Sequence, residues 1–507
     1  MRRGLLACAM ILSACVSRPA PRTGPIVIAM ANSPINFDPG IGLDESSQKI
    51  HQLLYSSLLR IDDSLHVVPD LATRFDSPDP LTYVAEVRHG VRFHDGRELT
   101  ADDVAFTYRR FLDPAFVSGR KGAYKMIKAV EILDRYTVAF HLAEPSSSFP
   151  INLVMGIVPA GTGASAARTP IGTGPYRLTE FVPDDHTVLA PYADYFGGAP
   201  KNEGLRFVVV PDDTMRGLEL RKGSVDLVVN DLPPDLVDGL RRESHIETAT
   251  APGTDFAYIG MNLRDPVLAD RRVRLAIGYA VDRDAIVQYL RRGFAQPAAG
   301  LIPPMSWAFE PGVFQFTHDP DRAKALLDEA GYRDPDGDGP LPRLRLTLKT
   351  STSEAYRLQA AVIQQNLAGV GIAVEVRSSE FASMFADVQK GNVQLYTLQW
   401  VGVTDPDMLR RVFHSTQVPP SGFNRGRYRN ADVDRLIDAA SAARDEGERR
   451  ALYGQAERLI ALDAPCISLW YKTNVAVFQR GLSGVTLNPV ADLAFLANVS
   501  RDRMTQR

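Results

Sequence analysis

The chain has 507 residues, more than one compact domain usually holds, so its length predicts two or three domains. Its 45% hydrophobic and 23% charged residues are typical of a globular protein. A formal net charge of −3 shows no basic excess and argues against nucleic acid as the main partner. After the N-terminal segment no apolar stretch approaches about 18 residues, so the mature chain is not expected to span a membrane.

The first fifteen residues have the pattern of a secretory signal peptide. Two arginines precede the apolar run 4–12, which is far too short to cross a bilayer. Ser13 and Ala14 directly before Cys15 resemble a lipobox, the bacterial motif in which the peptide is cut before a cysteine that carries lipid. We therefore predict a lipid anchor at Cys15, which places the protein in the periplasm or cell envelope, tethered to a membrane.

The segment 16–25 contains three prolines and is predicted to be an extended tether that reaches at most about 35 Å. The folded body is expected to begin near Ile26. Of the three cysteines, Cys8 lies in the signal and Cys15 in the anchor, which leaves only Cys466. No intramolecular disulfide can form in the mature chain, so its stability must come from a large core.

In chain order, the first half of the folded body is predicted to hold strands at 26–31 and 82–87, a second strand with a turn at 91–96, and helices at 48–59 and 104–111. Thr100 is expected to be the N-cap of the second helix, and Asp102 and Asp103 are helix-capping rather than ligand-binding residues. The second half is predicted to hold strands at 205–210, 344–348, 373–376 and 394–399 and a helix at 354–367. This alternation indicates sheets covered by helices.

Several motifs along the chain resemble the signature of one family. They include the Gly-Thr-Gly-Pro-Tyr segment 172–176 and the segments 53–59, 68–72, 91–104, 273–283 and 319–332. Together they are similar to the bacterial extracellular solute-binding proteins of family 5, which serve peptide and nickel ABC importers. The likeness covers nearly the whole mature chain, with the motifs in the family's order.

The resemblance implies an α/β fold, a two-lobed periplasmic binding protein of the type II-like class with an extra domain inserted in the first lobe. The first lobe is then expected to consist of residues 26–52, 166–258 and 480–507. The inserted domain takes residues 53–165 and the second lobe residues 259–479. Breaks rich in proline and glycine at 145–150 and 156–170 bracket the end of the inserted domain.

The resemblance also implies the function of a substrate-binding lipoprotein of an ABC importer. Such a protein captures a peptide or peptide-like small polar solute between its lobes and delivers it to permease and ATPase subunits in the membrane. It is expected to be a monomer without a cofactor. Two alternatives stay open: a solute binder for signalling or chaperoning, and an importer component for an oligosaccharide or a metal chelate.

No motif in the sequence argues for an enzyme. There is no Gly-x-Ser-x-Gly elbow and no His-Glu-x-x-His pair, and Cys466 has no histidine near it in the sequence. His94 is expected to be a structural hydrogen-bonding residue rather than a metal ligand. The acidic segment 334–339 resembles half of a calcium loop, but Arg345 stands where the loop needs a glutamate, so we predict a polar turn and no metal site.

The predicted binding cleft is centred on Trp400, which ends an apolar strand. Gly402 and Pro406 follow, and a strand end of this kind leaves backbone groups free where α/β sheets bind ligands. In the family this segment lines the cleft, and the backbone after the tryptophan pairs with a bound peptide like an added strand. The expected contacts here are Gln399, Trp400, Val401, Gly402, Thr404 and Asp405.

One position departs from the family. Peptide binders have an aspartate three residues after this tryptophan that receives the peptide's α-amino group, and this chain has Val403 there. A buried ammonium group without a partner costs roughly 3–5 kcal/mol, or two to three orders of magnitude in affinity. Either Asp405 takes over the charge, or the ligand presents no free amino terminus at this point.

Other candidate contacts follow from position in the family. They are Ser33 and Phe37 after the first strand, Tyr258 and Asn262 at the crossing into the second lobe, and Phe423, Asn424 and Arg425 after the Trp400 loop. For each of them, packing within a lobe or a place in a solvated loop is the alternative.

Overall fold

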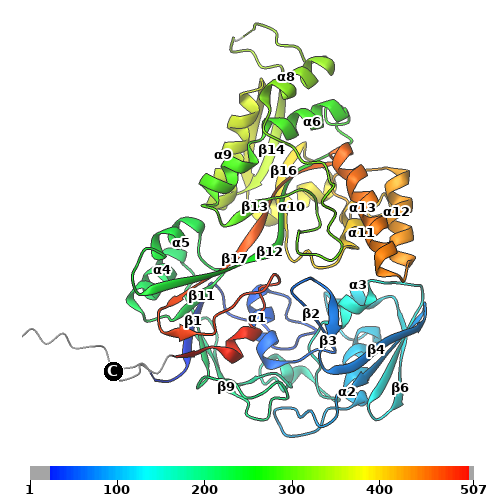
Figure 1. Cartoon of the computed structure of the whole chain (residues 1–507), viewed down its shortest axis with the longest axis vertical. Helices are drawn as coiled ribbons and strands as arrows, with labels where there is room; N and C mark the ends of the chain where they lie inside the picture. Colours follow the sequence, from blue (N-terminus) through cyan, green and yellow to red (C-terminus); the bar gives the residue numbers. More distant parts are fainter. Residues whose placement is uncertain (1–22, 338, 502–507) are drawn as a thin grey trace, which may run out of the picture.

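The computed structural model describes residues 23–337 and 339–501. One mixed sheet of eleven strands runs through the molecule in the order β15-β14-β16-β12-β17-β11-β1-β10-β9-β8, with β13 paired to β17. Its strands are β1 (Ile26–Met30), β8 (Tyr176–Val182), β9 (His186–Pro191), β10 (Leu205–Val209), β11 (Leu227–Val229), β12 (Ile246–Met261), β13 (Ala295–Pro297), β14 (Leu344–Ser351), β15 (Ile372–Ser379), β16 (Leu395–Trp400) and β17 (Cys466–Gln479). The described part is therefore a mixed α/β fold of two lobes (Figure 1).

A second sheet with its own core lies beside the first lobe. Its strand order is β4-β5-β7-β6, and it packs against helix α2 (Ala101–Arg109). We call this part the insert and define it by its core cluster, which runs from Leu58 to Ile157. Its elements are β2 (Leu59–Ile61), β3 (Val67–Pro69), β4 (Ala72–Asp79), β5 (Thr82–Val87), α3 (Lys121–Tyr124), β6 (Ile127–Asp134), β7 (Thr137–Leu142) and the 3₁₀ turns Arg110–Leu112 and Phe149–Leu153.

The remaining helices cover the large sheet (Figure 1). On the first lobe they are α1 (Glu45–Leu54), α4 (Asp213–Lys222) and α5 (Pro234–Leu240), with 3₁₀ turns at Ala164–Ala167 and Ala494–Asn498 and the short strand pair β18 (Leu482–Ser483) and β19 (Ser500–Arg501). On the second lobe they are α6 (Arg271–Ala280), α7 (Arg283–Ala285), a π turn (Ile286–Leu290), α8 (Pro320–Glu329), α9 (Glu354–Ala368), α10 (Phe381–Lys390), α11 (Met408–Phe413), α12 (Ala431–Ala442) and α13 (Glu446–Asp463). Strand β12 separates two cores there, because successive side chains point to opposite faces: Ile259 belongs to one core and Tyr258 to the other.

The antiparallel pair β12–β17 joins the two lobes. Its first part, residues 246–252 of β12, pairs with β17 where β17 also borders the first-lobe strand β11. Its second part, residues 256–261, pairs with both β17 and the second-lobe strand β16. The register shifts between Pro252 and Phe256, so an irregular segment separates the two parts. The predicted lobe and domain boundaries stay predictions, since the sheet continues through both lobes.

Most predicted strands are confirmed, and one is wrong. Strands β1, β5, β10, β14, β15 and β16 and helix α9 lie where the sequence pattern placed them. Of the strand with a turn predicted at 91–96, the turn is present and the strand is not, since Arg92 forms only one isolated bridge, to Glu98. Gly96 has a φ of 88°, and this left-handed conformation folds the segment back so that the Phe93 N–H donates to the Arg97 carbonyl (2.8 Å).

The two early helices begin before their predicted first residues. Helix α1 begins at Glu45 because the Asp44 carboxylate accepts the Ser47 N–H (2.8 Å). Helix α2 begins at Ala101, with Thr100 as its predicted N-cap and Asp103 completing a capping box. Helix α1 ends at Leu54, short of the predicted residue 59, because the backbone turns to an extended conformation at Tyr55.

Gly253 lies in the irregular segment of β12, and we predict that a methyl group there is not tolerated. A Cβ at this position would lie 2.5 Å from the Lys472 carbonyl oxygen of β17. Gly253→Ala should therefore lower the free energy of unfolding by about 1–3 kcal/mol in urea titrations. Gly239→Ala is the control, because its Cβ would meet no atom within 4 Å, and it should be neutral or stabilising by up to about 1 kcal/mol. Equal urea midpoints for the two variants would contradict the close approach.

Glu457 of α13 is a buried carboxyl group, and burial raises its pKa to about 8. One oxygen, Oε1, accepts the Ile302 N–H (3.1 Å), while Oε2 has no hydrogen-bond partner among the described residues. The folded chain therefore holds a proton that the unfolded chain, with an ordinary pKa of 4.5, releases. The stability from this group is fully present below pH 4.5 and is lost as the pH rises toward 8.

We predict that Glu457→Gln reduces this pH dependence. The glutamine retains the shape and the oxygen that accepts the Ile302 N–H, but it does not ionise. Between pH 5 and 8 the wild-type free energy of unfolding should fall by up to about 1.4 kcal/mol per pH unit more steeply than that of the variant. Urea denaturation at pH 5, 6.5 and 8 measures the difference, and parallel pH profiles would refute a protonated Glu457.

Candidate functional site

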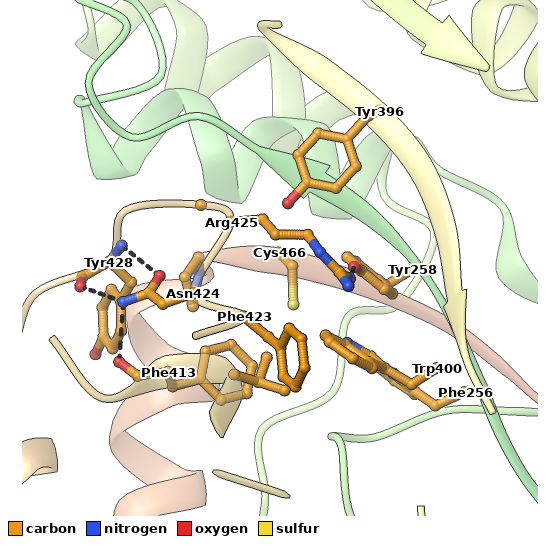
Figure 2. Close-up of a pocket in the computed structure, with 13 residues that line it drawn as sticks. Phe256, Tyr258, Tyr396, Trp400, Phe413, Phe423, Asn424, Arg425, Tyr428 and Cys466 are labelled. Carbon is orange, nitrogen blue, oxygen red and sulfur yellow. Dashed lines mark hydrogen bonds between the residues drawn. The ribbon is translucent and has the colours of Figure 1, made fainter. Parts of the chain in front are cut away.

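A small pocket lies beside Trp400, at the end of β16 (Figure 2). Its volume is about 20 Å³, room for about one water molecule. The lining comes from β12, β16, α11, the start of β17 and the loop after α11, and it consists of Phe256, Tyr258, Tyr396, Trp400, Val412, Phe413, Phe423, Asn424, Arg425, Gly426, Tyr428, Pro465 and Cys466. The tertiary fold thus brings together five of the residues expected to contact the ligand: Tyr258, Trp400, Phe423, Asn424 and Arg425.

Arg425 fills the centre of this pocket. Its guanidinium lies over the Trp400 ring, 4.2 Å from the centroid, and its Nη1 donates to the Tyr258 hydroxyl (3.2 Å). The Trp400 ring in turn stacks on Tyr258, with centroids 6.4 Å apart and planes 7° apart, and Phe423 meets it edge-on at 5.6 Å. In this conformation the protein's own side chains therefore occupy most of the space around Trp400.

The loop after Trp400 is held by Asp255 from the irregular segment of β12. One carboxylate oxygen of Asp255 accepts from the Gln399 side chain (2.8 Å), and the other accepts the Gly402 N–H (3.0 Å). The Val401 side chain is 76% exposed, and its N–H and C=O bond to no described residue. Val401 therefore offers backbone groups to a ligand, as the sequence analysis expects of a strand end.

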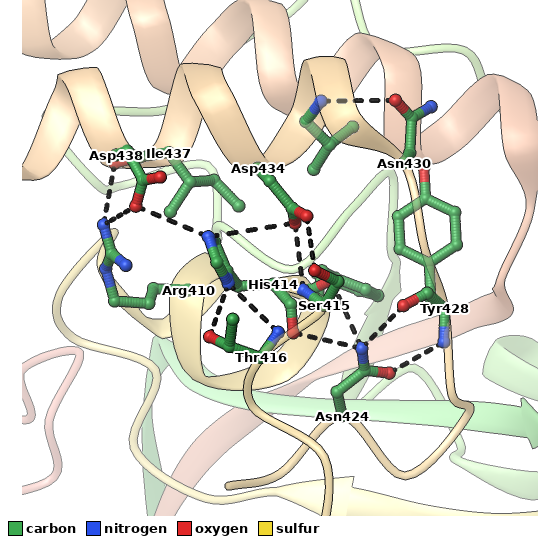
Figure 3. A network of polar contacts seen from close by, with 12 residues as sticks. Arg410, His414, Ser415, Thr416, Asn424, Tyr428, Asn430, Asp434, Ile437 and Asp438 are labelled. Atoms are coloured by element: carbon green, nitrogen blue, oxygen red, sulfur yellow. Dashed lines mark hydrogen bonds and ion pairs between the residues drawn. The ribbon is translucent and has the colours of Figure 1, made fainter.

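A polar network holds the loop that carries Arg425 (Figure 3). The Asn424 amide donates to the carbonyls of Tyr428 (2.8 Å) and His414 (3.1 Å), and its oxygen accepts the Tyr428 N–H (2.9 Å). Ser415 is tied to α12 through Asp434, whose carboxylate accepts the Ser415 N–H (2.9 Å). Asn424 is 1% exposed, so its amide positions the loop and has no free face for a ligand.

A row of alternating charges leads from the Trp400 loop to the first lobe. Asp255 lies 3.9 Å from Lys472 of β17. On α1, Lys49 contacts Glu45 (2.8 Å) and Asp231 (3.1 Å). Burial alone would raise the pKa of Glu45, but Lys49 and Lys472 together hold it below its ordinary value. Lys472 of β17 thus interacts both with Asp255, beside Trp400, and with Glu45 of the first lobe.

The other predicted site residues are not part of this pocket. Ser33 lines a separate surface hollow of about 450 Å³ on the first lobe, with Asp44 and Glu45 among its walls. Phe37 is fully buried in the first-lobe core, edge-on to Phe181 at 4.9 Å. Asn262 is buried, and its amide donates to two backbone carbonyls, those of Gly391 and Val393 (both 3.1 Å).

Two residues of the loop after Trp400, Val403 and Asp405, are the ones that the sequence analysis relates to a ligand's amino group. Val403 is 1% exposed, and its N–H donates to the Thr254 carbonyl (3.1 Å). Thr404 and Asp405 are half-buried, and the Asp405 carboxylate accepts the Asp407 N–H (2.8 Å). Burial and the neighbouring Asp407 raise the pKa of Asp405 to about 6. A carboxyl group with this pKa is half protonated at pH 6 and mostly ionised at pH 7.

Sequence reasoning missed Asp255, Tyr396 and Cys466. Asp255 could have been found as a carboxylate placed inside an otherwise apolar strand pattern, three residues before Tyr258. Tyr396 and Cys466 carry no such signal, because their place in the pocket depends on which strands pair.

Two expectations about other sites can be compared with the fold. His94 hydrogen-bonds to the backbone of Gly172 and Gly174, as expected of a structural residue. No group of three metal-ligating side chains is found in residues 23–337 and 339–501. Within the same ranges, no helix has the length and apolar character needed to cross a bilayer.

We predict that Asp255→Ala releases the Trp400 loop. Without the carboxylate, the Gly402 amide loses its acceptor, and its hydrogen exchange should accelerate at least about ten-fold. Exchange at Val403 should change less, because that amide bonds to a backbone carbonyl. Asp255→Asn, which retains an acceptor oxygen, is the matched control and should stay near the wild-type rate. Unchanged Gly402 exchange in the alanine variant would contradict this role.

Comparison with known proteins gives a consistent result. The model for "Bacterial extracellular solute-binding proteins, family 5 Middle" matches residues 66–419. The oligopeptide-binding protein AppA of Bacillus subtilis is 30% identical, over 93% of this chain and 90% of the relative. The glutathione-binding protein GsiB of Escherichia coli is also 30% identical, over 93% of each chain. Among solved structures, NikZ from Campylobacter jejuni in complex with Ni(L-His) is similar with a TM-score of 0.78 and 26% identity, over 94% of this chain and 99% of that one.

Proposed function

Since the chain belongs to the bacterial extracellular solute-binding proteins of family 5, we propose that it is the binding component of an ABC importer. It captures a peptide or a peptide-like small polar solute between its lobes and delivers it to a permease in the membrane. The Trp400 loop is the observation that carries this proposal. A half-buried aromatic ring and the free backbone groups of Val401 lie together where β12 and β17 pass from one lobe to the other.

Contacts across the cleft support a closing motion. The insert reaches the second lobe through the β2–β3 turn, where the Trp307 N–H donates to the Ser64 carbonyl (3.0 Å) and the His66 ring stacks on Trp307 at 6.0 Å. A second contact joins Ser147 of the insert to the Ser441 carbonyl at the end of α12 (3.2 Å). These few polar contacts are weak enough to break and re-form as the lobes move. A ligand that contacts both lobes would favour the closed state.

The chemistry of the relatives sets the range of solutes. AppA is named for binding oligopeptides and GsiB for binding glutathione, and NikZ is in complex with Ni(L-His); all of these ligands carry amide or carboxylate groups. A peptide-like solute fits the free N–H and C=O of Val401, which can pair with an extended backbone. The Asp405 carboxylate is half-buried and turned toward the Asp407 N–H (2.8 Å), which argues against it as the partner of an α-amino group.

The proposal includes the cellular setting. The chain acts outside the cytoplasmic membrane as a monomer, held by lipid at Cys15 and a tether that ends near Ile26. Cys15 lies outside the described residues, so the anchor rests on the sequence motif. The Trp307–Ser64 and Ser147–Ser441 contacts bring the insert onto the second lobe and so present both lobes together to a permease.

We expect calorimetry with di- to pentapeptides to detect binding that depends on Trp400. Trp400→Ala should weaken the affinity about 10- to 100-fold, because a central aromatic contact is worth roughly 1.4–2.8 kcal/mol. Tyr289→Ala, which removes a 65% exposed aromatic ring elsewhere, is the control and should bind like wild type.

Solution scattering provides the second measurement. A bound ligand should lower the radius of gyration of the wild-type protein, because the lobes close on it. Native mass spectrometry of the freshly purified protein identifies any solute that is carried along. The peptide proposal would be overturned if no peptide bound or compacted the protein and the co-purified solute contained no amide.

A further inference from the structure

Arg425 is a buried cation without an anionic partner. Its side chain is 7% exposed, and no carboxylate of the described residues lies within ion-pair distance of its guanidinium. The Nη1 donates to the Tyr258 hydroxyl, the buried Nε has no hydrogen-bond partner, and the Nη2 donates to no described residue. Two of the three guanidinium nitrogens, Nε and Nη2, therefore have no hydrogen-bond partner among the described residues.

Aromatic faces hold the guanidinium in place of a counter-ion. Besides Trp400, the rings of Phe385 and Phe423 lie 5.0 Å and 5.6 Å from it. Such faces attract a cation but neutralise no charge, and a guanidinium out of water needs an anion or several acceptors for full compensation. Two other arginines show how such a charge is compensated in this protein. The two terminal nitrogens of Arg110 pair with both oxygens of Asp38 (2.8 Å each), and Arg274 donates to four backbone carbonyls.

The surroundings of Arg425 favour an anion. None of the residues that line the pocket carries a carboxylate. Position 403, where a peptide binder would supply one, holds the buried Val403, and the Asp405 carboxylate is turned toward the Asp407 N–H. The local charge of the Trp400 pocket is therefore positive, and an ammonium group would be repelled there.

We propose that Arg425 determines the specificity of this site by receiving a carboxylate of the solute against the Trp400 ring. The inference rests on the proposed function and narrows it: the solutes are anionic peptides or peptide-like acids, and they do not present a free amino group at this point. The carboxylate takes the free Nη2 and Nε in the two-pronged geometry that a guanidinium offers. Phe423, 40% exposed at the pocket mouth, turns aside to admit it, since the pocket now holds only about 20 Å³.

Three forms of trialanine separate this proposal from ordinary peptide binding. N-acetyl-trialanine is an anion. N-acetyl-trialanine amide is neutral, and trialanine amide, which has a free amino group, is a cation. We expect calorimetry on the full chain to give the anionic form at least ten-fold tighter binding than the neutral form, with the cationic form weakest. Arg425→Met should abolish this ratio, while Arg425→Lys retains part of it.

Arg429→Met is the matched control. Arg429 belongs to the same loop, is exposed, and has no side-chain partner among the described residues. Its variant should keep the wild-type ratio between the anionic and neutral forms. A ratio unchanged in Arg425→Met, or strongest binding of the cationic form by wild type, would overturn the proposal.

A direct measurement tests Arg425 without any peptide. In protein labelled with ¹⁵N-arginine, the Nε signal that Arg425→Lys removes should shift with acetate and saturate, and it should not shift with acetamide at equal ionic strength. An acetate shift without peptide binding would uphold the anion site and refute the peptide importer. Peptide binding without an acetate shift and without dependence on Arg425 would uphold the importer and refute the anion site.

Discussion

The β12–β17 pair is the interaction on which the rest of the structure depends. These two long strands pass through both lobes, and every connection between the lobes within the large sheet runs through them. Between Pro252 and Phe256 the ladder loses its register, and this short irregular segment carries Gly253 and Asp255. The same place in the chain is therefore both the point of least regular pairing between the lobes and the support of the Trp400 loop.

The carboxylate of Asp255 holds the loop after Trp400, in part through a backbone amide of that loop. Asp255 accepts hydrogen bonds from the Gln399 side chain and the Gly402 amide, and it stands near Lys472 of the neighbouring strand. A shift of β12 against β17 would move this carboxylate and with it the loop that presents Val401. The pairing of the two strands and the shape of the loop after Trp400 thus depend on the same side chain, which gives the proposed closing motion a physical link to this loop.

The protein places its buried charges in two different ways. Some are compensated, by a carboxylate in the pair of Arg110 with Asp38 that joins the insert to the first lobe, or by four backbone carbonyls around Arg274. At Trp400 the cation of Arg425 is surrounded by rings and lacks a carboxylate. Retaining an uncompensated charge costs stability, so a site that keeps one is a candidate for function.

Prediction from the sequence succeeded where the deciding residues are neighbours in the chain. Periodic apolar residues placed β5 and α9, and Thr100 with Asp103 placed the start of α2, because a cap acts on the turn that follows it. At 91–96 the predicted turn is present and the predicted strand is absent, because Gly96 adopts a left-handed conformation that reverses the chain. Alternation of side chains alone did not reveal that only one isolated bridge forms there.

The sequence by itself determined the class of fold and the family, and it predicted Trp400 as a ligand contact, since ordered motifs and a strand followed by glycine and proline are local features. Only the tertiary structure decided which side chains meet at Trp400. It set Arg425 on the ring, buried Phe37 and Asn424 away from solvent, and brought Asp255 from a distant strand to hold the loop. These placements depend on strand order and register, which arise from packing between segments far apart in the chain, and no local pattern encodes them.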